Sequence, residues 1–153
     1  MHPKLEAIFN EAESRYLKPE ELKIISQYVE SLPSRLETYQ QLRDKELEIM
    51  QAVASQLETQ LPQAKTSELE RSLKNAMLML RYCGIAMLLN DESFVKERLR
   101  GWLDVIVETY NSSEIETKLY RLLWQQLSQV MSKEQLGLLK PSLTMAKEIL
   151  INK

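Results

Sequence analysis

The sequence predicts an all-α protein, and three observations carry this prediction. The chain has 153 residues, about the length of one domain with a single sizeable core. It contains only three glycines and five prolines, which is few for the hairpin turns of a β protein. Apolar residues recur along most of the chain at the three- and four-residue spacing of amphipathic helices. No internal repeat or flexible linker divides the sequence, so we expect residues 1–153 to form a single domain.

Two short helices are predicted at the N-terminus. Residues 3–14 place Leu5, Ile8 and Phe9 on one helical face, and so short a helix needs a surface to cover. A second helix is expected to begin near Pro19, because proline is tolerated in a first turn and acidic residues follow it. Its apolar stripe consists of Leu22, Ile25, Val29 and Leu32. Pro33 is expected to break or kink this helix, so residues 1–31 would form an arm.

A long helix is predicted for residues 34–61, and Pro62 ends it. The residues expected to face inward along this helix are Leu36, Tyr39, Leu42, Leu47, Met50, Val53, Ala54 and Leu57.

Four further helices are predicted at residues 67–89, 93–110, 113–131 and 133–150. Capping boxes, in which a hydroxyl and a carboxylate or amide satisfy free backbone N–H groups, are expected at three of their starts. The pairs are Ser67 with Glu70, Ser113 with Glu116, and Ser132 with Gln135. Pro141 is expected to kink the last helix.

The composition excludes several classes of protein. The formal net charge is −2 with mixed signs along the chain, so no electrostatic footprint for nucleic acid is present. The single cysteine cannot form an internal disulfide, which is typical of a reducing cytoplasm. The first residues do not resemble a signal peptide, and the longest apolar run, 76–89, is too short to span a bilayer. We therefore expect a cytoplasmic protein that does not insert into membranes.

The sequence also lacks the motifs of common catalytic and metal sites. His2 is the only histidine and lies in a terminus expected to be mobile, so a histidine-bound haem, metal or general base has no support. No glycine-rich phosphate loop and no nucleophile elbow occur. The protein is therefore not expected to be an enzyme or to hold a metal.

Several motifs, in this order, resemble those of the phycobiliproteins. RYLKPEEL at 15–22 resembles the family's Tyr-Leu-Ser/Thr-x-x-Glu-Leu run, and LRDKELEIMQAVASQL at 42–57 takes the place of the following helix. SLKNAMLMLRYCGIAMLLND at 72–91 resembles the helix that carries the pigment, with Leu-Arg and Asn-Asp in register. VETYN at 107–111 resembles the family's Arg-Glu-x-Tyr. The resemblance implies a globin-like helical bundle with two additional N-terminal helices that pack on a partner subunit.

The resemblance also implies that the pigment site has degenerated. The family's cysteine, which forms a thioether to a linear tetrapyrrole, is replaced by Ser72, whose hydroxyl is not a comparable nucleophile. The arginine that pairs with a bilin propionate is replaced by Lys74, and the aspartate that contacts the pyrrole nitrogens by Asn75. No covalent bilin is therefore expected, and Cys83 is expected to be a buried, inert thiol rather than a substitute.

The family's subunit-pairing residues are retained. In the family, an N-terminal acid and an arginine on the pigment helix pair across the two-subunit interface, and Glu11 and Arg81 occupy those positions. Pairing inside one chain, or solvation of Arg81, is the alternative. Together with the apolar face Leu5, Ile8 and Phe9, these residues are the expected subunit interface.

Three functions remain open from the sequence. The first is a non-pigmented interaction protein that pairs as a homodimer, or as a heterodimer with a phycobiliprotein subunit. It would act in phycobilisome assembly, turnover or regulation near thylakoid-bound antennae. The second is a noncovalent bilin carrier or light sensor, for which Lys74, Tyr82, Trp102 and Tyr110 would supply contacts. The third is a globin-like stress-signalling sensor module.

Overall fold

A computed structural model describes residues 2–151, and it confirms the all-α prediction. In order, the helices are α1 (Pro3–Glu11), α2 (Pro19–Gln60), α3 (Thr66–Leu89), α4 (Ser93–Leu99), α5 (Leu103–Thr109), α6 (Ser113–Val130) and α7 (Lys133–Leu150). No strand occurs among the described residues. The expected single domain of 1–153 includes Met1, Asn152 and Lys153, which lie outside that range.

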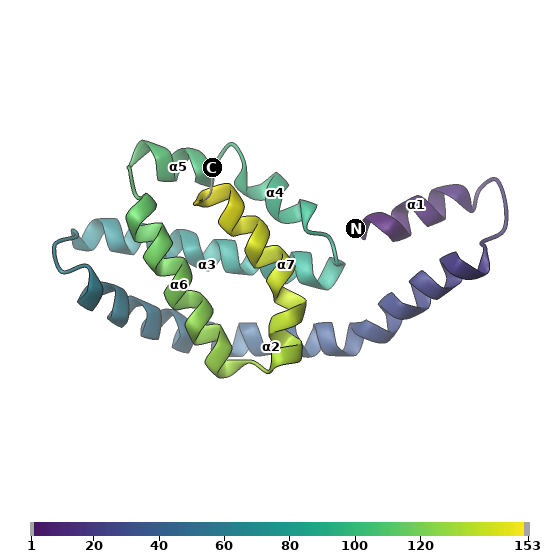
Figure 1. The fold of residues 1–153 in the computed structure, drawn as a ribbon, viewed down its shortest axis with the longest axis horizontal. Helices are drawn as coiled ribbons and strands as arrows, with labels where there is room; N and C mark the ends of the chain where they lie inside the picture. The colour runs from purple at the N-terminus through teal and green to yellow at the C-terminus, as the bar shows by residue number, and fades with distance from the viewer. Residues whose placement is uncertain (1, 152–153) are drawn as a thin grey trace.

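The body of the molecule is built around α2 and α3. These two helices run side by side, and the hairpin of α6 and α7 crosses them (Figure 1). Helix α4 packs on α3 and α7, while α5 covers one end of α6 and α7. The fully buried side chains of the core include Ile49, Val53, Leu57, Cys83, Met87, Leu122, Leu123, Leu127, Leu139 and Leu143. Within residues 2–151, the second half of α2 and helices α3 to α7 thus contribute to one apolar core, whereas α1 and the first half of α2 lie outside it.

Those two segments project from the body as an arm (Figure 1). Helix α1 packs on α2 through Leu5 and Ile8, which are both buried. Phe9, which the sequence places with them in the expected subunit interface, is 46% exposed and thus remains available to a partner. Within the arm, α1 and α2 therefore share a small apolar contact of their own, and further stabilisation of the arm must come from its contacts with the body.

Helix α2 continues through Pro33, so the expected break does not occur. A proline inside a helix removes one backbone hydrogen bond, here the one to the carbonyl of Val29. Pro33 is exposed, so water can reach that carbonyl, and the penalty is smaller than in a core. Helix α7 likewise continues through Pro141.

The expected single helix at 93–110 is divided into α4 and α5. Gly101 has a φ of +79°, in the left-handed region that side chains avoid, and the chain turns there. The spacing of apolar residues did not reveal this break, because Val95, Leu99, Leu103 and Val107 keep a four-residue period across it.

Only one of the three expected capping boxes forms. The Ser132 hydroxyl accepts a hydrogen bond from the Gln135 N–H at 3.1 Å, and the Gln135 side chain accepts one from Ser132 at 3.0 Å. Helix α3 instead begins one residue early, at Thr66, so Ser67 is not its cap. At α6 the cap position is Ser112, and Glu116 turns into the core instead of bonding Ser113.

Candidate functional site

The arm is joined to the body at the C-terminal end of α3. The Tyr28 hydroxyl donates a hydrogen bond to the Leu88 carbonyl at 2.7 Å, and Arg35 Nη1 donates one to the Met87 carbonyl at 2.6 Å. Both carbonyls lie in the last turn of α3, where backbone acceptors have no partner inside the helix. An arginine is also favourable there, because the C-terminal end of a helix carries partial negative charge. Partial burial lowers the pKa of Arg35.

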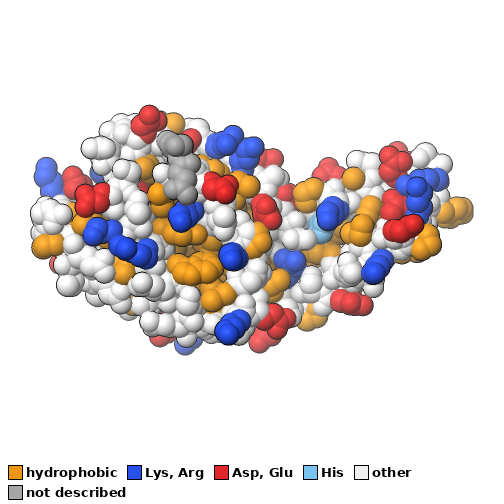
Figure 2. All heavy atoms as spheres, in the orientation of Figure 1, with side chains coloured by type: hydrophobic (Ala, Val, Ile, Leu, Met, Phe, Trp, Pro, Cys, Tyr) orange, Lys and Arg blue, Asp and Glu red, His pale blue; other side chains and the backbone are white. Residues whose placement is uncertain are grey.

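His2 makes the third contact of this joint, which corrects the expectation that it is mobile. Its side chain is only 6% exposed, and its Nε2 lies 2.9 Å from the side-chain nitrogen of Asn90. Its Nδ1 accepts hydrogen bonds from the backbone of Lys4 and Leu5, so His2 caps α1. Beside the joint, an open crevice of about 550 Å³ separates arm and body, visible as a hollow in Figure 2.

The turn at the far end of the arm is held by one ion pair. Arg15 donates two hydrogen bonds to the Glu21 carboxylate, at 2.7 and 3.0 Å. The same carboxylate accepts the Lys18 backbone N–H at 2.8 Å. These interactions lower the pKa of Glu21 to about 2, with the Arg15 hydrogen bonds contributing most. These contacts thus order the turn between α1 and α2.

One face of α2 exposes a row of apolar residues, which we call the arm stripe: Leu22, Ile25, Val29, Leu32 and Leu36. The sequence pattern suggested a buried face, yet Leu22, Val29 and Leu36 are 53%, 54% and 52% exposed. Ile25 and Leu32 are half-buried. The spacing alternates between three and four residues, which is the seam pattern of two helices packed along their length. Leu47, also expected to face inward, is 67% exposed further along α2.

A small cavity follows the arm stripe where α2 meets α3. It holds about 110 Å³ and is lined by Tyr39, Leu42, Arg43, Glu46, Leu80, Arg81 and Gly84. Tyr39 lies three residues after Leu36, so the stripe leads directly to this cavity. A Cβ atom added to Gly84 would lie 3.4 Å from the Tyr39 ring, so the absence of a side chain lets the ring approach α3.

Arg81 stands at the rim of this cavity and pairs with Glu46 in the same chain. Its Nε and Nη2 donate to the two carboxylate oxygens at 2.8 and 2.9 Å. Arg81 nevertheless remains 57% exposed, so a second chain can still reach it. Glu11 ends α1 at the far tip of the arm, away from α3, and therefore does not meet Arg81 within one chain (Figure 1). The pairing of Glu11 with Arg81 across two chains stays a prediction.

The residues aligned with the pigment site do not line one open pocket. Ser72 is 1% exposed and its hydroxyl bonds the carboxyl of Glu116 on α6. Lys74 is exposed and Asn75 is half-buried. Next to Ser72 along α3, Ala76 and Met79 line a cavity of only about 10 Å³. Small-molecule sites typically need about 300–1,000 Å³.

Glu116 is the buried acid that the sequence pattern missed. Burial, opposed by the Ser72 hydrogen bond and by Arg71, raises the pKa of Glu116 to about 7. The Arg71 guanidinium also stacks over the Tyr110 ring at 3.8 Å, which ties the end of α5 to α3. The capping pattern had assigned Glu116 to the surface, and only packing of α6 on α3 brings it against Ser72.

Cys83 is fully buried, and burial raises the pKa of its thiol to about 12. Tyr82 packs edge-on against Phe94, while Trp102 and Tyr110 are 38% and 56% exposed. These aromatic residues therefore do not gather around a common cavity.

Within residues 2–151, no group of three acidic, histidine or cysteine side chains is placed to hold a metal ion. Over the same range, no helix is long and apolar enough to cross a membrane.

The fold and surface define a class of helical protein with a globin-like body and a projecting N-terminal arm. The model of the phycobilisome protein family matches residues 9–150, nearly the whole chain. The protein therefore belongs to the phycobilisome protein family. No match was found among curated proteins. Family membership confirms the resemblance drawn from the motifs, and proteins of this family are light-harvesting components rather than enzymes.

Proposed function

We propose that this protein is a phycobilisome interaction protein without an attached bilin, and that it acts by docking its arm stripe on a partner subunit. The partner would be a second copy of the chain or a phycobiliprotein subunit. The protein would act in assembly, turnover or regulation of the antenna, in the cytoplasm and peripheral to thylakoid-bound phycobilisomes. Membership in this family favours such a role over a globin-like stress sensor.

The observation that carries the proposal is the exposure of the arm stripe. Three large aliphatic side chains, each more than half exposed, lie in a straight row on a helix that projects from the body. Exposed rows of this kind mark sites of association, because burying them against a second apolar surface is favourable. Family members pair with other subunits, which supports a partner of that kind.

Two further features support docking rather than pigment binding. The stripe ends at a cavity rimmed by the exposed arginine Arg81, which offers a partner both an apolar recess and a charge. Beside Ser72, by contrast, the space is about 10 Å³ and the serine is engaged with Glu116. A noncovalent bilin at that position would require α3 and α6 to separate.

The test is sedimentation of the wild type alone and after mixing with purified phycobiliprotein subunits. Leu22→Glu, Val29→Glu and Leu36→Glu place charges along the stripe without touching the core. Val105→Glu is the matched control, because Val105 on α5 is 49% exposed and lies outside the arm. We expect the stripe variants to lose association at least tenfold while the control retains it. Equal association of all four variants, or a wild type that stays monomeric in both experiments, would refute the proposal.

Expression together with a bilin-producing pathway addresses the alternative. We expect a colourless protein with no zinc-enhanced fluorescence on a denaturing gel. A protein that purifies with a tetrapyrrole would favour the carrier or sensor instead.

A further inference from the structure

His2 occupies a position where three structural elements meet. It precedes Pro3 at the start of α1, packs edge-on against the Tyr28 ring of α2 at 5.0 Å, and contacts Asn90 after α3. Asn90 itself has a φ of 48°, the left-handed conformation that ends helix α3. The only histidine of the chain thus links the tip of α1 to the body.

The hydrogen bonds define the protonation state that this arrangement needs. Nδ1 accepts from the backbone N–H groups of Lys4 and Leu5, at 3.2 and 3.4 Å, so it must carry a lone pair. A neutral imidazole then has its proton on Nε2, which faces the amide of Asn90 at 2.9 Å. The structure places the amide nitrogen of Asn90 at this position, so the amide must be flipped to present its oxygen to the Nε2 proton. With the amide in that flipped orientation, neutral His2 satisfies every one of these contacts, while a doubly protonated ring cannot act as the cap of α1.

The charges around His2 also favour the neutral form. Lys4 on α1 and Arg35 on α2 are cations near the ring, and Asp91 after α3 is the acid that opposes them. Tyr28 contributes a neutral ring, and Glu92 and Ser93 line the same crevice. A positive charge at a helix N-terminus is unfavourable in addition, because that end carries partial positive charge.

We propose that His2 is a proton-sensitive latch: its neutral form fastens α1 to the end of α3, and its protonation releases α1 and opens the arm. The released element is small, since α1 has nine residues and buries only Leu5 and Ile8 among its own residues. A helix of this length is not stable alone, so its position depends on tertiary contacts, and its cap and its contact to Asn90 are two of them.

The direction of the pH dependence follows from the pKa of His2. Burial, followed by Arg35, lowers that pKa from its ordinary value of 6.5. The open arm binds a proton more readily than the closed arm. Closure is therefore complete above pH 6.5 and is progressively lost as the pH falls from 6.5 through the lowered pKa of the closed form.

If the arm stripe docks a partner as proposed, the latch sets the shape of the docking element and makes association depend on pH. The latch itself can be measured in a dilute solution of this protein without any partner. If the latch experiment gives a negative result, the proposed docking function is not affected. If no partner is found, the latch can still be tested.

The experiment is a pH titration of the full chain by NMR between about pH 5 and pH 8. Because the chain has one histidine, its imidazole gives a single Cε1–H resonance. We expect an apparent pKa below 6.5, with the amide resonances of Lys4 and Leu5 moving at the same midpoint. A pKa at or above 6.5, or amides that do not respond, would overturn the latch.

Two variants separate a latch from a merely structural cap. His2→Asn keeps a cap acceptor but cannot titrate, so the Lys4 and Leu5 amides should no longer move with pH. His2→Ala lacks the cap, so the arm should be open at both pH 5 and pH 8.

Spin labels at the exposed positions Glu6→Cys and Lys96→Cys report the distance from α1 to α4. We expect this distance to lengthen at low pH in the wild type and to stay constant in His2→Asn. The same lengthening in both proteins would overturn the proposal.

Discussion

Arg81 and Glu46 face each other across α3 and α2 and are joined by two parallel hydrogen bonds of 2.8 and 2.9 Å. This geometry matches the planar guanidinium to both carboxylate oxygens. The pair stands at the solvent-exposed rim of the cavity that ends the arm stripe. It therefore orients Arg81 toward the surface where a partner would dock.

The Arg81 pair should matter more for association than for stability. Exposed ion pairs contribute little to folding, so Arg81→Ala should shift the midpoint of urea unfolding only slightly. If Arg81 meets Glu11 of a second chain, Arg81→Glu should weaken association, and the added change Glu11→Arg should restore it. Sedimentation of the single and double variants measures both effects. A double variant that associates no better than Arg81→Glu would exclude this pairing.

Glu116 should make stability fall as the pH rises. Its pKa is about 7 in the fold against an ordinary value of 4.5, so the folded state holds its proton more tightly than the unfolded chain. The free energy of unfolding therefore decreases between pH 4.5 and 7 and is lowest above that range, by at most about 3 kcal/mol from this group. Glu116→Gln should consequently stabilise the protein at pH 8 more than at pH 5, as measured by urea unfolding.

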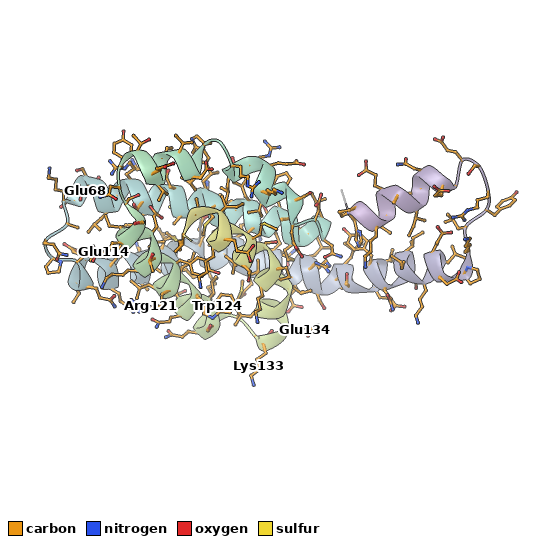
Figure 3. All side chains as sticks on the ribbon, turned by 45° about the horizontal axis from the view of Figure 1, so that its top comes forward. Glu68, Glu114, Arg121, Trp124, Lys133 and Glu134 are labelled. Atoms are coloured by element: carbon orange, nitrogen blue, oxygen red, sulfur yellow. The ribbon has the colours of Figure 1, made fainter. Side chains whose placement is uncertain are left out.

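Glu114→Gln is the matched control for that experiment. Glu114 lies on the first turn of the same helix but is exposed at the surface (Figure 3). This variant should change the free energy of unfolding little at either pH. A Glu116→Gln effect that is the same at both pH values would show that the carboxyl keeps its charge in the fold.

Cys83 should react only when the protein unfolds. Its thiol is fully buried and its pKa is raised to about 12, so neither access nor thiolate is available in the folded state at pH 8. Alkylation in increasing urea should follow the unfolding transition seen by circular dichroism. Rapid labelling in the absence of urea would mean that α3 is more accessible than its packing indicates.

Two glycines should respond to alanine in opposite directions. Gly101→Ala places a side chain at a φ of +79° between α4 and α5 and should destabilise the fold by about 1–2 kcal/mol. Gly137 lies inside α7 with open space around it, so Gly137→Ala should stabilise by about 1 kcal/mol. Thermal unfolding of the two variants against wild type is the measurement. Stabilisation by Gly101→Ala would show that the chain can continue as one helix there.

The sequence by itself determined the helical class, the ends of most helices and the family. These features are local, because they depend on periodicity, on a cap such as Ser132 and on which residue stands at a motif position. Composition also indicated correctly that Cys83 would be buried.

The tertiary structure alone decided which faces of the helices are covered. The pattern of Leu22, Val29 and Leu36 is that of a buried face, and their exposure follows from α2 extending past the body rather than from any local signal. His2 gained a structural role because the arm returns to the end of α3, and Glu116 became a buried acid because α6 packs on Ser72. Burial is a property of the packed chain, since it depends on residues that are distant in sequence. Helical periodicity specifies a face, and only the neighbouring elements specify whether water or protein covers it.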